Sequence, residues 1–398
     1  MRLFLVGLIA AGAAAAVAAR TAPNERASFV TTLGRDTVVI ESFTRSNNHI
    51  DGDIVVRVPG TVLCHYSADL AKDGSATKTV VDIKPLGTTD VKAQKISTTY
   101  EDGAAKITLE MPGQDPKMGI KMLDKNGFPF FMTGFGASYG LYSSLGMYEM
   151  FLPRVTSKVN DTTAVKSIDM ASANMGTRTF VRRSPTQVAV DYFGVGYTDL
   201  TVDANGQITG ADATHATTEK TVTSRADYID AGKLASTYAA ADKAGHGIGA
   251  ASPNKVQRGT LAGQQIMVTF GSPKKRGRDI LGNVVPYDRV WRTGANEATV
   301  LDLGHDAMIG GAAVPAGTYS LWTLPAKGGT VTLIINKQHG QWGTDYDPAQ
   351  DLVRVPMQVT TASSPQEDFN IAVTGSGNAD ELRMSWDTFV WTVPITAK

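Results

Sequence analysis

The sequence predicts a mainly β protein made of two β domains, with one or two short helices in the N-terminal part. Short segments rich in Val, Ile, Thr and Tyr recur along the chain, for example Thr37–Phe43 and Lys106–Glu110. Asx-Gly dipeptides such as Asp51-Gly52, Asp102-Gly103 and Asn205-Gly206 punctuate the chain, and this combination is typical of antiparallel hairpins. A regular alternation of strands with long helices is missing, which argues against a doubly wound fold.

Residues 1–19 are predicted to be an export signal. Arg2 supplies a positive charge, the residues up to Val17 are apolar, and small residues end the segment at Ala19. The apolar stretch is Ala-rich, whereas a spanning helix needs about 20 strongly apolar residues. Cleavage is therefore favoured, and retention as an anchor is the alternative. We expect a periplasmic or secreted protein, and since Cys64 is the only cysteine, no disulfide within the chain.

Two stretches depart from the strand pattern. Leu141–Leu152 has apolar residues at helical spacing and stops at Pro153, and Asp230–Lys243 predicts a second, Ala-rich helix. A Gly- and Ala-rich run follows it and predicts a linker. We therefore expect a signal peptide over 1–19, an N-terminal β-rich domain over 25–255 and a C-terminal domain over 256–398.

Tryptophan occurs five times, always in the C-terminal domain. We expect most of the five to be buried, because a tryptophan buries a large apolar area. Trp342, in a polar loop, is the one expected to be exposed. Trp386 and Trp391 are an odd number of positions apart, so a regular strand would point them to opposite faces.

Composition excludes several function classes. Lys plus Arg and Asp plus Glu are balanced at 38 each, so there is no global field to attract nucleic acid. The six histidines are scattered, without metal-ligand spacing. Asp51-Gly-Asp53 and Asp345-Tyr-Asp347 lack the alternating ligands of a calcium loop and are interpreted as hairpin turns. No nucleotide-binding fingerprint follows a strand, and we expect neither a metal nor a cofactor.

One motif suggests a nucleophile. Gly136–Gly140 matches G-x-S-x-G, which would place Ser138 on a turn between an apolar run and the predicted helix at Leu141. A downstream Asp and His would complete a triad. With 40 glycines in the chain the pattern arises readily by chance, and the parallel sheet that positions such a turn is not predicted. A turn before a packed helix is the favoured interpretation.

The segment Gly271–Thr299 gathers arginines around turn-forming residues, with Glu297 and Asp302 near enough to pair with them. Arginine grips carboxylate or phosphate at two points. One interpretation is an anion or polar-ligand site centred on Arg292, Asn296 and Glu297. The other, which we favour, is a network of ion pairs that pins an irregular loop. The candidate binding residues are Arg276, Arg278, Arg292, Asn296, Glu297 and Trp342, with Arg289 in the same segment.

The phrases Lys275–Thr299 and Val314–Trp322 resemble the signature of the DUF2911 family. The resemblance covers about residues 258–398 and includes Thr332–Lys337 and Gln341–Gly343. It implies an exported domain, an antiparallel β-sandwich whose biochemical role is undefined.

The sequence thus favours an exported, non-catalytic binding or accessory (scaffold) protein. It is either an extrinsic subunit of a membrane complex or a carrier of a small apolar ligand; the alternative is a serine hydrolase using Ser138. The aromatic and Met-rich segment Phe128–Leu152 would line an apolar groove, dock on a partner, or cap its own core. The expected partner is an unknown protein or small ligand of the cell envelope. Membrane contact is expected only through the signal segment or a membrane-bound partner.

Overall fold

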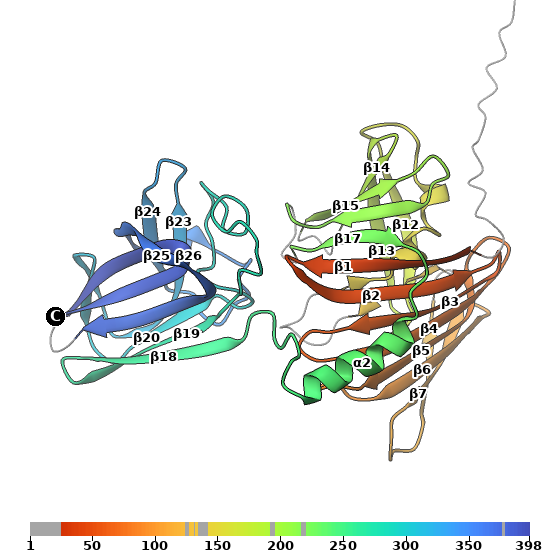
Figure 1. Ribbon diagram of the computed structural model, residues 1–398, viewed down its shortest axis with the longest axis horizontal. Coiled ribbons are helices and arrows are strands. Elements are labelled where there is room, and N and C mark those ends of the chain that lie inside the picture. Colours follow the sequence, from red (N-terminus) through yellow and green to blue (C-terminus); the bar gives the residue numbers. More distant parts are fainter. Residues whose placement is uncertain are drawn as a thin grey trace, which may run out of the picture.

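The structure, a computed structural model, describes residues 25–123, 127–130, 132–133, 142–191, 196–215, 220–375 and 379–398. These residues form two large β-sheets joined by a helix and an extended connection (Figure 1). The prediction of a mainly β protein with α-helices in its N-terminal part is confirmed. No helix within these ranges is long and apolar enough to cross a membrane.

The first sheet has fifteen strands, most of them neighbours in space as in sequence. One wing runs from β1 to β8 and the other from β17 to β12 and β9; β1 and β17 pair where the wings meet. Within the described ranges the pairs are antiparallel, except that β9 runs parallel to β12. The strands are β1 Glu25–Leu33, β2 Asp36–Arg45, β3 His49–Val56, β4 Val62–Leu70, β5 Ala76–Pro85, β6 Gln94–Glu101, β7 Ala104–Glu110, β8 Lys117–Met122, β9 Phe128–Phe130, β12 Thr162–Asp169, β13 Met175–Ser184, β14 Gln187–Asp191, β15 Tyr197–Val202, β16 Ile208–Asp212 and β17 Val222–Ala226, with a separate ribbon of β10 Met132–Thr133 and β11 Tyr142–Ser143.

The two wings fold over one another and share one core. Phe43 from the first wing and Phe180 from the second belong to the same buried apolar cluster. Residues 143–155 lie between the wings and are here called the internal segment. This segment contains α1 (Leu145–Tyr148) and the 3-10 helix η1 (Leu152–Arg154). Its apolar side chains are buried in that cluster, so the internal segment fills the space between the wings.

The prediction of a helix over Leu141–Leu152 is wrong in its length, because the helix is much shorter. α1 has four residues, and the Ser144 side chain caps it by accepting from the Met147 N–H over 3.1 Å. All four helical residues are buried, rather than one face only. Contacts with both wings therefore set the path of the chain, which is common because tertiary packing provides most of a helix's stability.

α2 (Ala231–Lys243) lies on the outside of the first wing, against β2, β3 and β4 (Figure 1). Asp230 caps it, accepting from the Lys233 N–H over 2.9 Å, and the helix predicted here is confirmed. Its buried positions are alanines, and such small side chains let the helix approach the sheet closely.

The second sheet has nine strands in the order β18-β19-β20-β23-β24-β25-β26-β21-β22. Leu301 and Leu333 from its first half and Met384 and Val393 from its second lie in one buried cluster. The sheet is therefore folded into two facing layers, the predicted antiparallel sandwich. The strands are β18 Asn254–Leu261, β19 Gln264–Gly271, β20 Thr299–Leu303, β21 Ala307–Ile309, β22 Ala312–Val314, β23 Gly317–Pro325, β24 Val331–Asn336, β25 Asp351–Gly375 and β26 Ala379–Ala397, with a 3-10 turn η2 at Pro348–Gln350.

Four tryptophans are buried, whereas Trp342 is half-buried. Trp386 and Trp391 both lie in the core and both contact the Trp291 ring, with centroids 6.3 and 6.4 Å away. The expectation that they point to opposite faces is wrong because β26 is irregular between them. Asp387 has a φ of 49°, and the register with β25 shifts there.

Asp51-Gly52 is not a turn, contrary to prediction, but lies within β3. A Cβ on Gly52 would lie 2.6 Å from the Tyr66 ring, so glycine lets that ring pack against the strand. Asp51 and Asp53 flank His65 on the outer face, at 3.3 and 3.1 Å. Cys64 points the other way and is fully buried, as expected for a core residue, and burial raises the pKa of its thiol.

Candidate functional site

A small cavity lies between the two wings, against the internal segment. Its volume is about 60 Å³, and its walls include the apolar side chains of Phe29, Val39 and Leu145. The hydroxyls of Thr31 and Thr223, also in the wall, are hydrogen-bonded to each other over 2.8 Å. At about 30 Å³ per liquid water, the cavity has room for a few water molecules. A lipid chain would fit only if the internal segment moved.

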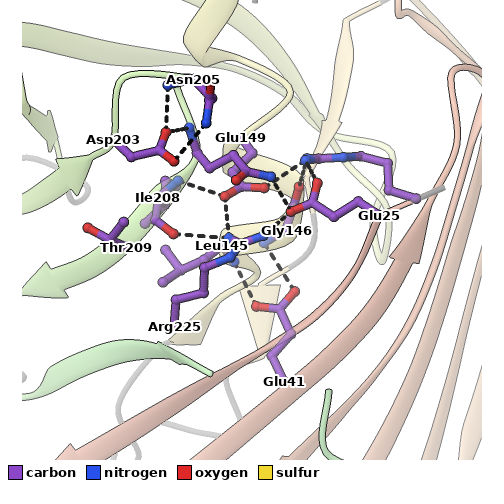
Figure 2. A network of polar contacts seen from close by, with 12 residues as sticks. Glu25, Glu41, Leu145, Gly146, Glu149, Asp203, Asn205, Ile208, Thr209 and Arg225 are labelled. Carbon is purple, nitrogen blue, oxygen red and sulfur yellow. Dashed lines mark hydrogen bonds and ion pairs between the residues drawn. The ribbon is translucent and has the colours of Figure 1, made fainter. Parts of the chain in front are cut away.

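Glu41 of β2 is the acidic group in the cavity wall, and it is fully enclosed. Its carboxyl accepts from the Tyr66 hydroxyl (2.6 Å), the Ser144 hydroxyl (2.5 Å) and the Leu145 and Gly146 N–H groups (2.8 and 3.3 Å; Figure 2). Burial raises the pKa of Glu41, and these four donors oppose the rise. The carboxyl thereby fixes the start of α1 to the first wing.

A ring of four charged side chains connects the C-terminal end of α1 to the strands where the two wings meet. Arg45 and Arg225 each contact both Glu25 and Glu149. Glu149 lies 2.8 Å from Arg45 and 2.6 Å from Arg225, and it also accepts from the Ile208 N–H over 2.7 Å (Figure 2). Burial raises the pKa of Glu149, while the two arginines act to lower it.

Most of these interior polar groups are partners of one another, although the Arg45 Nε has no hydrogen-bond partner among the described residues. In the ring, the two acids and two bases are balanced, and every carboxylate has charged donors. Such arrangements hold a specific conformation, because removing one member leaves its partner charged and buried. The ring and Glu41 therefore position the internal segment, whose apolar side chains belong to the core of the N-terminal domain.

The outer face of β8 is the main exposed apolar surface in the described ranges. Met118, Ile120 and Met122 alternate along this strand and are 85%, 72% and 75% exposed. β8 ends the first wing, and no described strand pairs with its outer edge. Proteins normally protect such an edge, because its free N–H and C=O groups pair readily with another chain. Lys117 and Lys121 alternate with these residues and occupy the opposite face.

Arg276, a predicted site residue, connects the two domains. Its side chain is buried and forms an ion pair with Asp36. Its carbonyl accepts from the Arg35 N–H over 2.9 Å, and its own N–H donates to Glu367 over 2.8 Å. Gly34 is held at a φ of 61° directly against this carbonyl. The acids around Arg276 are thus Asp36 and Glu367, instead of the predicted Glu297 and Asp302.

Arg278 stabilises its own turn. Its guanidinium donates to the carbonyls of Lys275 (3.1 Å) and Lys274 (2.5 Å). Burial lowers the pKa of Arg278 to about 10, and the charge of Arg276 acts in the same direction.

The remaining predicted residues meet around Gly343. A side chain at this position would collide with Arg292, and the Gly343 N–H donates to the Asn296 carbonyl over 2.9 Å. The Asn296 amide also donates to the Ser252 carbonyl over 3.3 Å. Glu297 and Trp342 pair through their backbones, with the Glu297 side chain exposed. Arg292, Asn296, Glu297 and Trp342 therefore lie together around Gly343; a binding role for them stays a prediction.

Ser138 lies outside the described residues, as does the whole of its G-x-S-x-G motif, Gly136–Gly140. Within the described ranges, no group of three His, Cys, Asp or Glu side chains is placed to hold a metal ion.

Sequence reasoning missed the interior charges. A weak signal for one of them was present, because Glu41 sits inside an apolar strand segment, Val38–Phe43. Its partners at the start of α1, however, come from about 100 positions away, and nothing local identifies them.

Comparison with known proteins agrees with the resemblance found in the C-terminal half. Residues 252–395 match the family model DUF2911, described as a protein of unknown function. No curated protein matches the sequence significantly. A crystal structure of a DUF1089 family protein from Pseudomonas aeruginosa is similar at 8% identity, covering 44% of this chain and 89% of the other, with a TM-score of 0.31. That score is too low to bear on fold or function.

Proposed function

We propose that this protein is an exported, non-catalytic accessory protein that docks on a partner of the cell envelope through strand β8. The observation that carries the proposal is the row Met118, Ile120 and Met122, exposed on β8, the strand whose outer edge no described strand pairs with. An edge of this kind accepts an extended segment as an additional strand, with main-chain hydrogen bonds giving affinity and alternate side chains giving specificity.

The side chains of β8 define the chemistry of the segment that fits. One face of the strand presents Met118, Ile120 and Met122, and the other presents Lys117 and Lys121. A matching segment has apolar residues on the first face and acidic residues on the second, since opposite charges across neighbouring strands are favourable. A protein that rests on a membrane complex through such a contact needs no spanning helix of its own.

The test compares binding to envelope membranes before and after the apolar row is removed. Met118→Thr/Ile120→Thr/Met122→Thr keeps residues suited to strands and should abolish cosedimentation with the membranes. A matched control is Val222→Thr/Val256→Thr/Val359→Thr, which changes three other exposed apolar residues, 42–46% exposed. Unchanged binding of the β8 variant would refute the docking surface. Binding to protein-free lipid vesicles would point to the lipid instead of a protein.

The carrier of a small apolar ligand remains a second proposal, supported by the cavity against Glu41. Because an exposed apolar row such as that of β8 would also attract a hydrophobic dye, the dye assay must use the β8 triple variant. Dye binding that persists in this variant and is lost on filling the cavity, for example in Ala211→Leu, supports the carrier.

The hydrolase alternative rests on the Ser138 motif. Labelling of the folded protein by a fluorophosphonate probe, lost in Ser138→Ala, would favour the hydrolase over the accessory protein.

A further inference from the structure

A second pocket, polar and larger than the cavity at Glu41, lies beside the ring of four charges. Its volume is about 520 Å³, within the range of roughly 300–1,000 Å³ that is typical of small-molecule sites. β17 pairs with β1 on one side and with β16 on the other. The lining comes from all three strands: residues 25–27 of β1, Gln207 and Thr209 around the start of β16, and residues 225–227 around the end of β17. The pairing of the sheet therefore brings these residues together.

One wall of the pocket is held in place before any ligand binds. Glu25 and Arg225 line the pocket and also belong to the charge ring, with side chains 7% and 17% exposed (Figure 2). Gln207 joins them, because its side-chain amide donates to Glu25 over 2.7 Å. Since the ring keeps these side chains in one conformation, a ligand would lose little affinity to their ordering.

Two other charged side chains at the pocket have no charged partner. Arg26 and Asp227 are both exposed, and no ion pair or side-chain hydrogen bond among the described residues includes either of them. The Arg26 guanidinium stacks on the Tyr228 ring, 3.5 Å from its centroid, and a stacked guanidinium keeps the N–H groups at its edge available. The pocket therefore offers one free cationic donor and one free anionic acceptor.

The composition of the lining limits the class of ligand. Two acids and two bases line the pocket, so neither a simple anion nor a simple cation is favoured. The apolar residues of the lining are two alanines, which offer little area to a lipid chain. A molecule with one carboxylate and one ammonium group matches both free charges, because a guanidinium binds carboxylate at two points and a carboxylate binds ammonium.

We propose that this pocket binds a small zwitterion, either a free amino acid or a short peptide. The carboxylate of the ligand contacts Arg26, its ammonium group contacts Asp227, and Gln207 and Thr209 form hydrogen bonds with the rest of it. The pocket shares no residue with β8, so this proposal stands or fails independently of the docking proposal.

Isothermal titration calorimetry of the full chain tests the proposal, with the standard amino acids, dialanine and trialanine as separate probes. At least one probe should bind, and the tightest one identifies a free amino acid or a peptide as the source. Its N-acetyl form lacks the ammonium group and its amide form lacks the carboxylate. Each form should bind about tenfold more weakly or worse, the size of one charge-assisted contact.

Arg26→Gln and Asp227→Asn should each weaken binding of the tightest probe about tenfold or more. Arg26→Gln should have little effect on binding of the amide form, whose carboxylate is already removed, and Asp227→Asn should have little effect on binding of the N-acetyl form. This pairing separates a direct contact from a general disturbance of the pocket. Both variants should melt near the parent, because exposed side chains outside ion pairs contribute little to stability.

The matched controls are Arg258→Gln and Asp115→Asn, which change exposed residues of the same two types that form no ion pair among the described residues. Both controls should bind the probe like the parent. The proposal is overturned if no probe binds, if the N-acetyl and amide forms bind as tightly as the zwitterion, or if the controls weaken binding as much as the pocket variants do.

Discussion

Arg276 and Asp36, 240 positions apart in the sequence, form an ion pair that connects the two domains. The guanidinium is 4% exposed and the carboxylate 31% exposed, so most of the pair is removed from water. The DUF2911-like loop is therefore fixed to the turn between β1 and β2.

Asp36→Asn should uncouple the domains. It leaves the Arg276 charge buried without its carboxylate, which costs about 3 kcal/mol, and calorimetry should resolve two unfolding transitions where the parent shows them closer together. The comparison is Arg35→Gln, which breaks the exposed 3.6 Å pair with Glu367 and should cost less than about 1 kcal/mol. Equal effects of the two variants would show that Arg276 does not carry the coupling.

Glu149→Gln should strongly destabilise the N-terminal domain. The substitution leaves Arg45 and Arg225 to share Glu25 alone, and we expect a loss of about 3–5 kcal/mol in the free energy of unfolding. Urea unfolding followed by tyrosine fluorescence measures it. Asp199→Asn, which removes an exposed pair with Arg183 at 3.9 Å, should change stability by less than about 1 kcal/mol. A small loss for both would mean that the ring does not hold the internal segment.

His65 should make stability depend on pH. The hydrogen bond to Asp53 raises the pKa of His65, with Asp51 and Asp82 acting in the same direction and burial against it. The stabilisation is fully present below the unfolded-state value of about 6.5 and is lost as pH rises through the higher folded-state pKa. Because the side chain is 38% exposed, the effect should stay under about 1 kcal/mol.

An NMR titration of the His65 ring checks this directly, and its midpoint should lie above 6.5, the reference value for histidine. His65→Asn should flatten the fall in stability that begins as pH rises above about 6.5. A midpoint at or below the reference value would contradict the assignment.

Short sequence patterns predicted the elements whose structure depends on neighbouring residues in the chain. Asp230 and the Ala-rich run define α2, and the turn at Asp102-Gly103 lies where the pattern placed it. The Asp51-Gly52 pattern misled because Gly52 serves the packing of Tyr66, which lies one strand away. Likewise, the irregularity at Asp387 places Trp386 and Trp391 on the same side of β26. The alternation of residues along a regular strand cannot reveal such an irregularity.

The sites were less predictable than the fold. The arginine-rich loop was visible in the sequence, and so was its resemblance to the DUF2911 signature. Its decisive partner was not, because Asp36 comes from the other domain. The β8 row was overlooked because an alternation of Met, Ile and Lys reads as an ordinary half-buried strand, and only the sheet order shows that β8 lies at an edge.

The most direct measurement of the central claim is photocrosslinking from β8 in intact cells. A benzophenone amino acid at position 120 should form an adduct with one envelope protein, and position 118 should give the same adduct. The same residue at position 256, an exposed apolar position of the other domain, should give none. The account is contradicted if positions 118 and 120 give no adduct, or only the adducts also obtained from position 256.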